Sequence, residues 1–93
     1  IILLFVYNPD TMKLSVIIPV YNEVESIKVI LKRVQETKLA KEIIIVDDGS
    51  KDGTRDVLKK LDGKKGVRVI LHEHNKGKGA AVRTGMAAAG GTS

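Results

Sequence analysis

The chain has 93 residues, a net charge of +5 and no cysteine, which fits one small domain without disulfides or thiolate metal sites. The positive charge favours anionic partners such as phosphates, nucleic acid or an acidic membrane surface. Its only aromatic residues are Phe5, Tyr7 and Tyr21. Single-stranded nucleic-acid binders interleave basic residues with aromatic stacking platforms, so we expect no nucleic-acid partner. The absence of cysteine fits a reducing compartment, and we predict a cytoplasmic protein.

Residues 1–6 are apolar, but the run is far shorter than the ~20 residues that span a bilayer. No small-residue cleavage site follows it, which argues against a signal peptide. Met12 directly precedes the first strand of the predicted domain. We therefore predict a leader or upstream segment over 1–11 and the domain over 12–93. The alternative is that residues 1–11 form an extra strand or a dimer contact.

The first predicted strand covers residues 14–19 and leads into a helix. Asn22 is expected to cap this helix, with Glu25 as the reciprocal partner three residues later. Apolar residues then recur at helical spacing and predict one buried face: Ile27, Ile30, Leu31 and Val34.

Further strands and helices alternate through the rest of the chain. Their predicted order is a strand over 42–47, a short helix capped by Asp52 or Ser50 that ends near Leu61, a turn over 62–66, a strand over 67–71 and an alanine-rich helix over 78–89. Three β-α units predict an α/β fold of Rossmann-like, three-layer type, with a parallel sheet and right-handed crossovers. In such sheets ligands bind at the carboxyl ends of the strands, where residues 19–23, 47–50 and 72–79 are expected to meet.

Two carboxylates end the strand over 42–47, directly after four β-branched residues. The apolar run is typical of a strand buried on both faces. We predict that Asp47 caps the backbone N–H groups of the turn that follows, and that Asp48 contacts a ligand. Gly49 permits the tight turn.

The residues expected at the strand ends suit a nucleotide. Tyr21 offers a flat face for a base or a ribose, and Asp48 can accept a hydrogen bond from either. Lys78 and the start of the last helix present positive charge to a diphosphate. A Walker P-loop is absent from the sequence, and the first turn lacks the glycines of a dinucleotide fingerprint.

Three ordered segments resemble the opening motifs of the family 2 glycosyltransferases, in particular those of the dolichol- or polyprenyl-phosphate sugar synthases. They read SVIIPVYNE over 15–23, IVDDGSKDGT over 45–54 and NKGKGAAVR over 75–83. The resemblance implies half of the nucleotide-diphospho-sugar transferase (GT-A) fold, a UDP- or GDP-sugar donor and inversion at the sugar carbon. It also implies a polyprenyl-phosphate acceptor at a membrane surface, and so a peripheral location at the inner face of the membrane.

The resemblance also assigns roles to individual positions. It implies that Pro19, Tyr21 and Glu23 line the nucleoside pocket, that Asp48 hydrogen-bonds the base, and that Lys78 lies near the nucleotide. A divalent metal, Mg²⁺ or Mn²⁺, is expected in the full-length family, where an Asp-x-Asp motif holds it. No Asp-x-Asp occurs in the 93 residues, so we predict that the chain alone is inactive. The alternative function is that of a non-catalytic nucleotide- or polyanion-binding α/β module.

Several of these residues have a purely structural alternative. Glu23 is equally well explained as an acidic residue that stabilises the start of the first helix. His72 and His74 are predicted to be surface residues rather than metal ligands. Arg83 faces either the diphosphate or water. We also predict self-association through an unpaired sheet edge or through residues 1–6.

Overall fold

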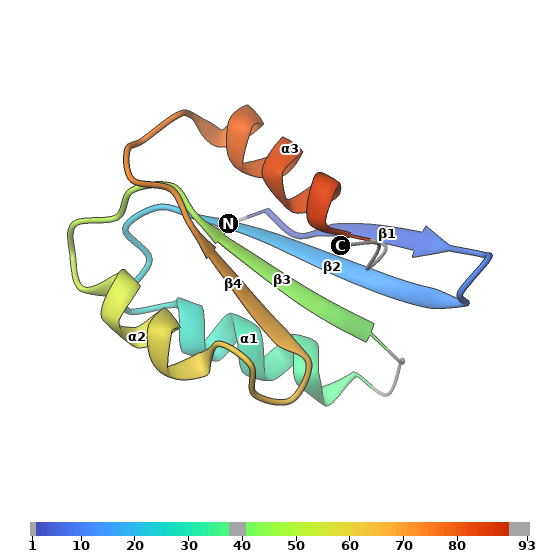
Figure 1. The fold of residues 1–93 in the computed structure, drawn as a ribbon. Helices are drawn as coiled ribbons and strands as arrows, with labels where there is room; N and C mark the ends of the chain where they lie inside the picture. The colour runs from blue at the N-terminus through green and yellow to red at the C-terminus, as the bar shows by residue number, and fades with distance from the viewer. Residues whose placement is uncertain (1, 38–40, 90–93) are drawn as a thin grey trace.

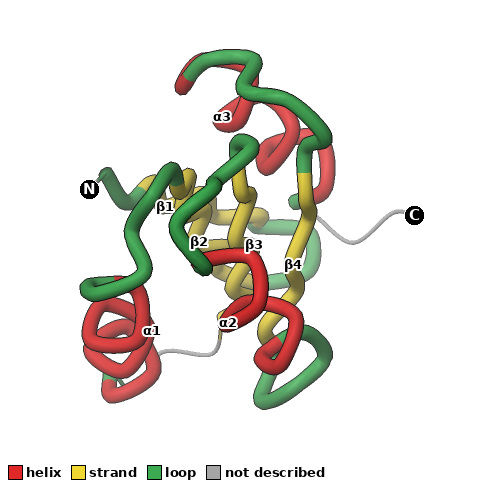
Figure 2. The backbone as a smooth tube through the Cα atoms, turned by 90° about the vertical axis from the view of Figure 1, so that its left-hand side faces the viewer, coloured by secondary structure: helices red, strands yellow, loops and turns green. Residues whose placement is uncertain are grey.

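The computed structural model describes residues 2–37 and 41–89, which form one sheet with helices on both faces (Figure 1). The strands follow the order β1-β2-β3-β4 across the sheet: β1 (Leu4–Asn8), β2 (Lys13–Val20), β3 (Lys41–Asp47) and β4 (Val67–Leu71). The helices are α1 (Ile27–Glu36), α2 (Thr54–Leu61) and α3 (Lys78–Ala88). Helices α1 and α2 cover one face and α3 covers the other (Figure 2).

Strands β2, β3 and β4 are parallel, as predicted, and β2 and β3 supply most of the buried hydrophobic residues in the described part of the chain. Val16 pairs with Ile43, and Ile43 with Val67. Because successive side chains of a strand point to opposite faces, the β-branched run of β3 feeds two cores. Ile43 and Ile45 pack in the core that also contains residues of α1 and α2, whereas Ile44 and Val46 pack with residues of α3. The α/β fold class is confirmed.

Helix α3 lies close to the sheet because small residues form its inner face. Ala81, Gly85 and Ala88 are its buried residues. A β-carbon built at Gly85 would clash with the Cγ2 atom of Ile17 in β2, so glycine is what permits this spacing. This close approach places the start of α3 beside the ends of β2 and β3 (Figure 1).

Strand β1 was not predicted as part of the sheet. It pairs antiparallel with β2, with Leu4 opposite Ile17 and Asn8 opposite Lys13, so the sheet is mixed rather than wholly parallel. For residues 4–8 the alternative of an extra strand is therefore the one that the structure shows. The apolar residues of this segment allow it to cover the edge of β2. Whether residues 1–11 are a leader stays a prediction.

The start of α1 was also predicted incorrectly. The helix begins at Ile27, and its N-cap is Ser26 rather than Asn22. Asn22 has a left-handed backbone with φ +52°, and its side chain accepts a hydrogen bond from the Lys51 N–H instead of capping the helix. In the segment between Asn22 and α1, the backbone N–H groups of Ser26 and Ile27 both donate to the Glu23 carbonyl, which forms a turn before the helix. The buried face of α1 is as predicted, with Ile30 only partly buried.

Candidate functional site

A cavity of about 300 Å³ opens at the carboxyl ends of β2 and β3, beside the start of α3. All five residues that the sequence assigned to binding line it: Pro19, Tyr21, Glu23, Asp48 and Lys78. They come from three segments that are separate in the sequence. The fold therefore brings the predicted binding residues together at one place, as expected for strand ends of a parallel sheet.

The other residues that line this cavity form two groups, and only the first belongs to segments that the sequence placed at this edge. Asn75 and Gly77 belong to the glycine-lysine segment, and Val20 ends β2. Ile2 and Ala81 carried no sequence signal for a binding role: Ile2 precedes β1, and Ala81 lies on the inner face of α3. These two residues add apolar surface to the cavity lining.

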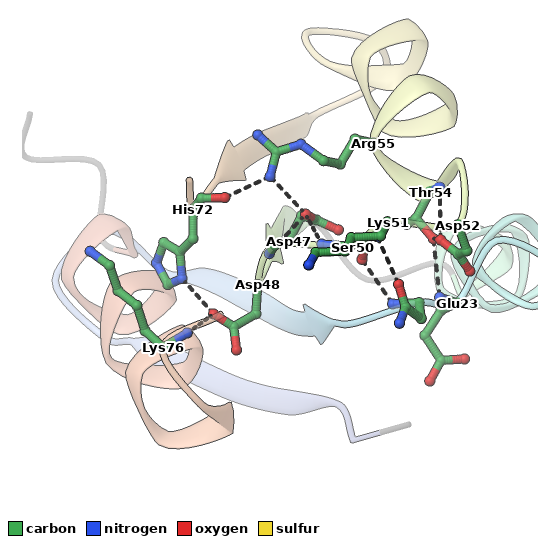
Figure 3. Close-up of polar contacts among 12 residues, drawn as sticks. Glu23, Asp47, Asp48, Ser50, Lys51, Asp52, Thr54, Arg55, His72 and Lys76 are labelled. Atoms are coloured by element: carbon green, nitrogen blue, oxygen red, sulfur yellow. Dashed lines mark hydrogen bonds and ion pairs between the residues drawn. The ribbon is translucent and has the colours of Figure 1, made fainter. Parts of the chain in front are cut away.

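Asp47 organises the turn after β3 and is fully buried. Its Oδ2 atom accepts hydrogen bonds from the backbone N–H groups of Gly49 at 3.2 Å and Ser50 at 3.0 Å. The same atom forms an ion pair with Arg55 of α2 at 3.3 Å. The structural role predicted for Asp47 is confirmed, because these contacts direct its carboxylate into the loop (Figure 3).

Asp48, the next residue, holds the loop between β4 and α3. Its Oδ1 atom accepts hydrogen bonds from the His72 ring Nδ1 at 3.0 Å and from the Lys76 N–H at 2.8 Å (Figure 3). Its Oδ2 atom accepts one from the Gly77 N–H at 2.9 Å. Burial raises the pKa of Asp48, but the hydrogen bonds from His72, Lys76 and Gly77 outweigh it, and the net pKa is lowered. Asp48 is therefore ionised at neutral pH, and Oδ2 keeps capacity for another hydrogen bond.

The loops after β2 and β3 are tied to each other. The Asn22 N–H donates to Ser50 Oγ at 2.8 Å, and the Lys51 N–H donates to Asn22 Oδ1 at 2.8 Å. The Glu23 N–H donates to Thr54 Oγ1 at 3.1 Å. These three bonds cross between two segments about thirty residues apart in the sequence, and they fix the backbone on either side of the Tyr21 and Glu23 side chains. The cavity wall is thus formed before any ligand binds.

The N-cap of α2 is Gly53, which has no side-chain cap, so the prediction that Asp52 or Ser50 caps this helix is wrong. Asp52 instead holds the first residue of the helix. Its Oδ1 atom accepts hydrogen bonds from the N–H of Thr54 at 3.0 Å and from the Thr54 hydroxyl. The hydroxyl bond is the main cause of the lowered pKa of Asp52. The Ser50 hydroxyl accepts a hydrogen bond from the Asn22 N–H and does not cap the helix.

The remaining predicted residues differ in how free they are to meet a ligand. Tyr21 is 44% exposed. The Glu23 carboxylate accepts a hydrogen bond from the Ser26 hydroxyl at 2.6 Å, next to the start of α1, while it also lines the cavity, so both interpretations of Glu23 hold geometrically. Pro19 lies beyond Ile17, the last residue of β2 that pairs with β1, where a sheet tolerates a residue without an N–H.

His72 is buried, and the prediction that it lies on the surface is wrong. Its Nδ1 contacts Asp48, and its Nε2 lies 2.8 Å from the Thr84 hydroxyl of α3. His74 is exposed, as expected. Thr84 carried no signal in the sequence, because only the packing of α3 against β2 and β3 places it beside the end of β4.

The described residues do not provide a divalent-metal site. Within 2–37 and 41–89, no group of three or more histidine or acidic side chains is arranged to hold an ion. Of the acidic residues that line the cavity, Asp48 is committed to N–H donors and Glu23 to a hydroxyl. Both carboxylates keep free lone pairs, but two acidic residues alone are fewer than such a group requires.

The chain was compared with known protein families and with curated proteins. The model of glycosyl transferase family 2 matches residues 15–92. The chain is 37% identical to the human dolichyl-phosphate beta-glucosyltransferase, with 87% of the chain and 29% of that protein aligned. It is 40% identical to the dolichol-phosphate mannosyltransferase of Pyrococcus furiosus, with 86% of the chain and 23% of that protein aligned.

A third relative extends the similarity to bacteria. The undecaprenyl-phosphate 4-deoxy-4-formamido-L-arabinose transferase of Aeromonas hydrophila is 37% identical, with 90% of the chain and 28% of that protein aligned. The chain thus spans less than a third of the length of these relatives. Apart from Ile2, which precedes β1, all residues that line the cavity lie within the family match. The chain belongs to glycosyl transferase family 2.

Proposed function

We propose that the cavity binds the nucleoside diphosphate part of a UDP- or GDP-sugar. The observation that carries this proposal is that five residues from three distant segments line one cavity with an aromatic side chain, an ionised carboxylate and a lysine. An aromatic side chain offers a flat face to a base or a ribose, a carboxylate accepts a hydrogen bond from either, and a lysine presents positive charge to a diphosphate. The names of the relatives, which are sugar transferases, support the same class of ligand.

Each group has a distinct part in the proposed complex. Tyr21 stacks on the base or the ribose, and the free capacity of Asp48 Oδ2 accepts a hydrogen bond from the base. The diphosphate lies at the start of α3, where the first turn contains no acidic residue and Lys78 supplies a positive charge. Pro19 and Glu23 complete the wall of the nucleoside pocket.

In the whole protein we propose that an inverting transfer follows, from the nucleotide-sugar to a polyprenyl phosphate. The relatives named for dolichyl, dolichol and undecaprenyl phosphate support this acceptor. None of the helices in the described part of the chain has the length and apolarity of a membrane span. We propose a cytoplasmic, peripheral location at the membrane surface. The metal that the family is expected to use would neutralise the leaving diphosphate, and the residues described here do not hold it.

Calorimetric titration with UDP and GDP, with and without Mn²⁺, tests the binding proposal. We expect saturable binding of one nucleotide that Mn²⁺ changes little, because the cavity is already formed and no metal ligands are grouped in it. Incubation with UDP- or GDP-sugars, Mn²⁺ and polyprenyl phosphate should give no transfer. Measurable transfer by the pure chain would contradict the predicted inactivity, and failure to bind either nucleotide would contradict the proposed function.

The alternative is a module that binds polyanions without selecting a nucleotide, and the net charge of +5 favours it. The two functions differ in their response to salt and to competitors. A polyanion site binds tripolyphosphate as well as UDP and weakens steeply with salt. For the proposed cavity, UDP or GDP should still bind at moderate salt when tripolyphosphate is present at the same concentration.

We further propose that the chain self-associates through β1. This strand is at the edge of the described sheet, and its Phe5 and Tyr7 side chains are 61% and 56% exposed. Two copies paired antiparallel about Val6 would place Phe5 of each opposite Tyr7 of the other, on one face of a continuous sheet. That arrangement satisfies the free edges and forms two aromatic cross-strand pairs.

Cysteine trapping tests this register, since the chain has no cysteine of its own. Val6→Cys should form a disulfide-linked dimer on mild oxidation, because residues opposite each other lie about 5 Å apart between Cα atoms. Leu4→Cys is the matched control: its two copies would lie roughly 13 Å apart and should not cross-link. A monomeric mass in sedimentation at high concentration would contradict the self-association.

A further inference from the structure

The His72 imidazole is buried where the end of β4, the loop after β3 and the start of α3 meet. It is 8% exposed, and both ring nitrogens have partners: Nδ1 contacts Asp48 Oδ1 at 3.0 Å, and Nε2 contacts Thr84 Oγ1 at 2.8 Å. The His72 backbone carbonyl accepts a hydrogen bond from Arg55 at 2.6 Å. The residue is therefore held from three sides. Its ring contacts the cavity carboxylate, as drawn in Figure 3, and joins it to helix α3 through Thr84.

We propose that His72 is a positioning residue for nucleotide binding, which acts by orienting the Asp48 carboxylate and joining it to α3 through Thr84. The proposal rests on the proposed nucleotide site. His72 does not line the cavity, so it acts on a ligand only through Asp48 and through the position of α3.

The hydrogen bonds of Asp48 show why the imidazole is needed. The Lys76 N–H and the Nδ1 atom of His72 both engage Oδ1, whereas Oδ2 has only the Gly77 N–H. Because two donors hold Oδ1, the carboxylate cannot rotate without breaking both bonds, and Oδ2 stays on the cavity side with free capacity. Without the ring donor, Asp48 loses the contact that fixes this rotamer from the β4 side.

The contact with Thr84 adds a second constraint. Thr84 lies on α3, the helix whose first residue, Lys78, lines the cavity. The chain Asp48–His72–Thr84 therefore links the group proposed to bind the base to the helix proposed to bind the diphosphate. A nucleotide needs both groups at a fixed separation, and preorganised separation is what increases affinity without new contacts.

The test compares UDP and GDP affinity in four variants, each checked for folding by its thermal unfolding midpoint. His72→Leu removes both ring contacts and should raise the nucleotide Kd about tenfold. His72→Asn keeps a donor for Asp48 and should stay within roughly threefold of the wild type. Thr84→Val removes the hydroxyl without changing shape and should raise Kd about threefold. His74→Leu changes an exposed histidine in the same loop and should leave Kd unchanged.

A double-mutant cycle separates positioning from a merely structural role. If His72 acts largely through Asp48, adding His72→Leu to Asp48→Ala should cause a smaller loss of affinity than His72→Leu causes in the wild type. A His72→Leu variant with a lower unfolding midpoint but a wild-type Kd would overturn the positioning role. An equal loss of affinity from His72→Leu in the wild type and in Asp48→Ala would also overturn it, and so would a His72→Asn variant that binds as weakly as His72→Leu. If the wild type binds neither nucleotide, the proposed function itself fails; if the wild type binds and His72→Leu binds equally well, only the role of His72 fails.

Discussion

Asp48→Ala is expected to weaken nucleotide binding at least ~30-fold and to lower the free energy of unfolding by about 3 kcal/mol. The carboxylate is 4% exposed and accepts hydrogen bonds from His72, Lys76 and Gly77. Its removal leaves these donors without their acceptor and also deletes the proposed contact with the base. Calorimetric titration measures the first effect and denaturant unfolding the second. A variant that keeps wild-type affinity would show that Asp48 holds the loop and has no part in the ligand site.

The lowered pKa of Asp48 gives the same carboxylate a pH signature. Burial opposes its ionisation, but the hydrogen bonds from His72, Lys76 and Gly77 lower the folded pKa below the ordinary value of 3.8. A depressed folded pKa stabilises the fold above the unfolded pKa, and this stability is lost as pH falls through the folded pKa. The stability advantage of the wild type over Asp48→Asn should therefore be constant from pH 7 to about 5 and shrink below pH 4. An advantage that begins to shrink near neutral pH would contradict this assignment.

Gly49→Ala is expected to lower the free energy of unfolding by about 3 kcal/mol and to abolish nucleotide binding. Gly49 has φ +79°, and a β-carbon there would lie 2.7 Å from the Asn75 N atom and 2.9 Å from the His74 carbonyl carbon. Both are backbone atoms, so the clash can be relieved only by moving the loop that carries the Lys76 and Gly77 donors of Asp48.

A matched control separates this clash from backbone strain. Gly63 also has positive φ, at +83°, but nothing lies within 4 Å of a β-carbon built on it. Gly63→Ala should therefore cost only the strain, about 1 kcal/mol, and leave nucleotide affinity unchanged. Denaturant unfolding and titration of both variants measure the comparison. Equal destabilisation by the two substitutions would mean that the Gly49 contact contributes nothing beyond its backbone angle.

The fold and the cavity were largely predictable because their signals are local. The β-branched residues of β3 and the helical spacing in α1 predict their own elements, and parallel strands bring their carboxyl ends to one edge by geometry alone. The predicted binding residues Tyr21, Asp48 and Lys78 lie next to these elements in the sequence, so their meeting in one cavity required no knowledge of side-chain packing.

The errors have a common physical cause. Asn22 has the side chain of a helix cap, but a long-range hydrogen bond with Lys51 uses it to join two loops, and the helix begins later. His72 looks like a surface residue in a polar loop, yet Asp48 and Thr84 surround it only after α3 packs on the sheet. In both cases the deciding partner is more than ten residues away in the sequence.

The sequence by itself determined the α/β class, the family and five of the residues that line the cavity, because periodicity, turn chemistry and motif order are properties of neighbouring residues. Only the tertiary structure decided that β1 pairs antiparallel with β2, that Ile2 and Ala81 line the cavity, and that His72 connects Asp48 to Thr84. These contacts depend on which segments the packed sheet and helices bring together, and no local pattern in the chain encodes that choice.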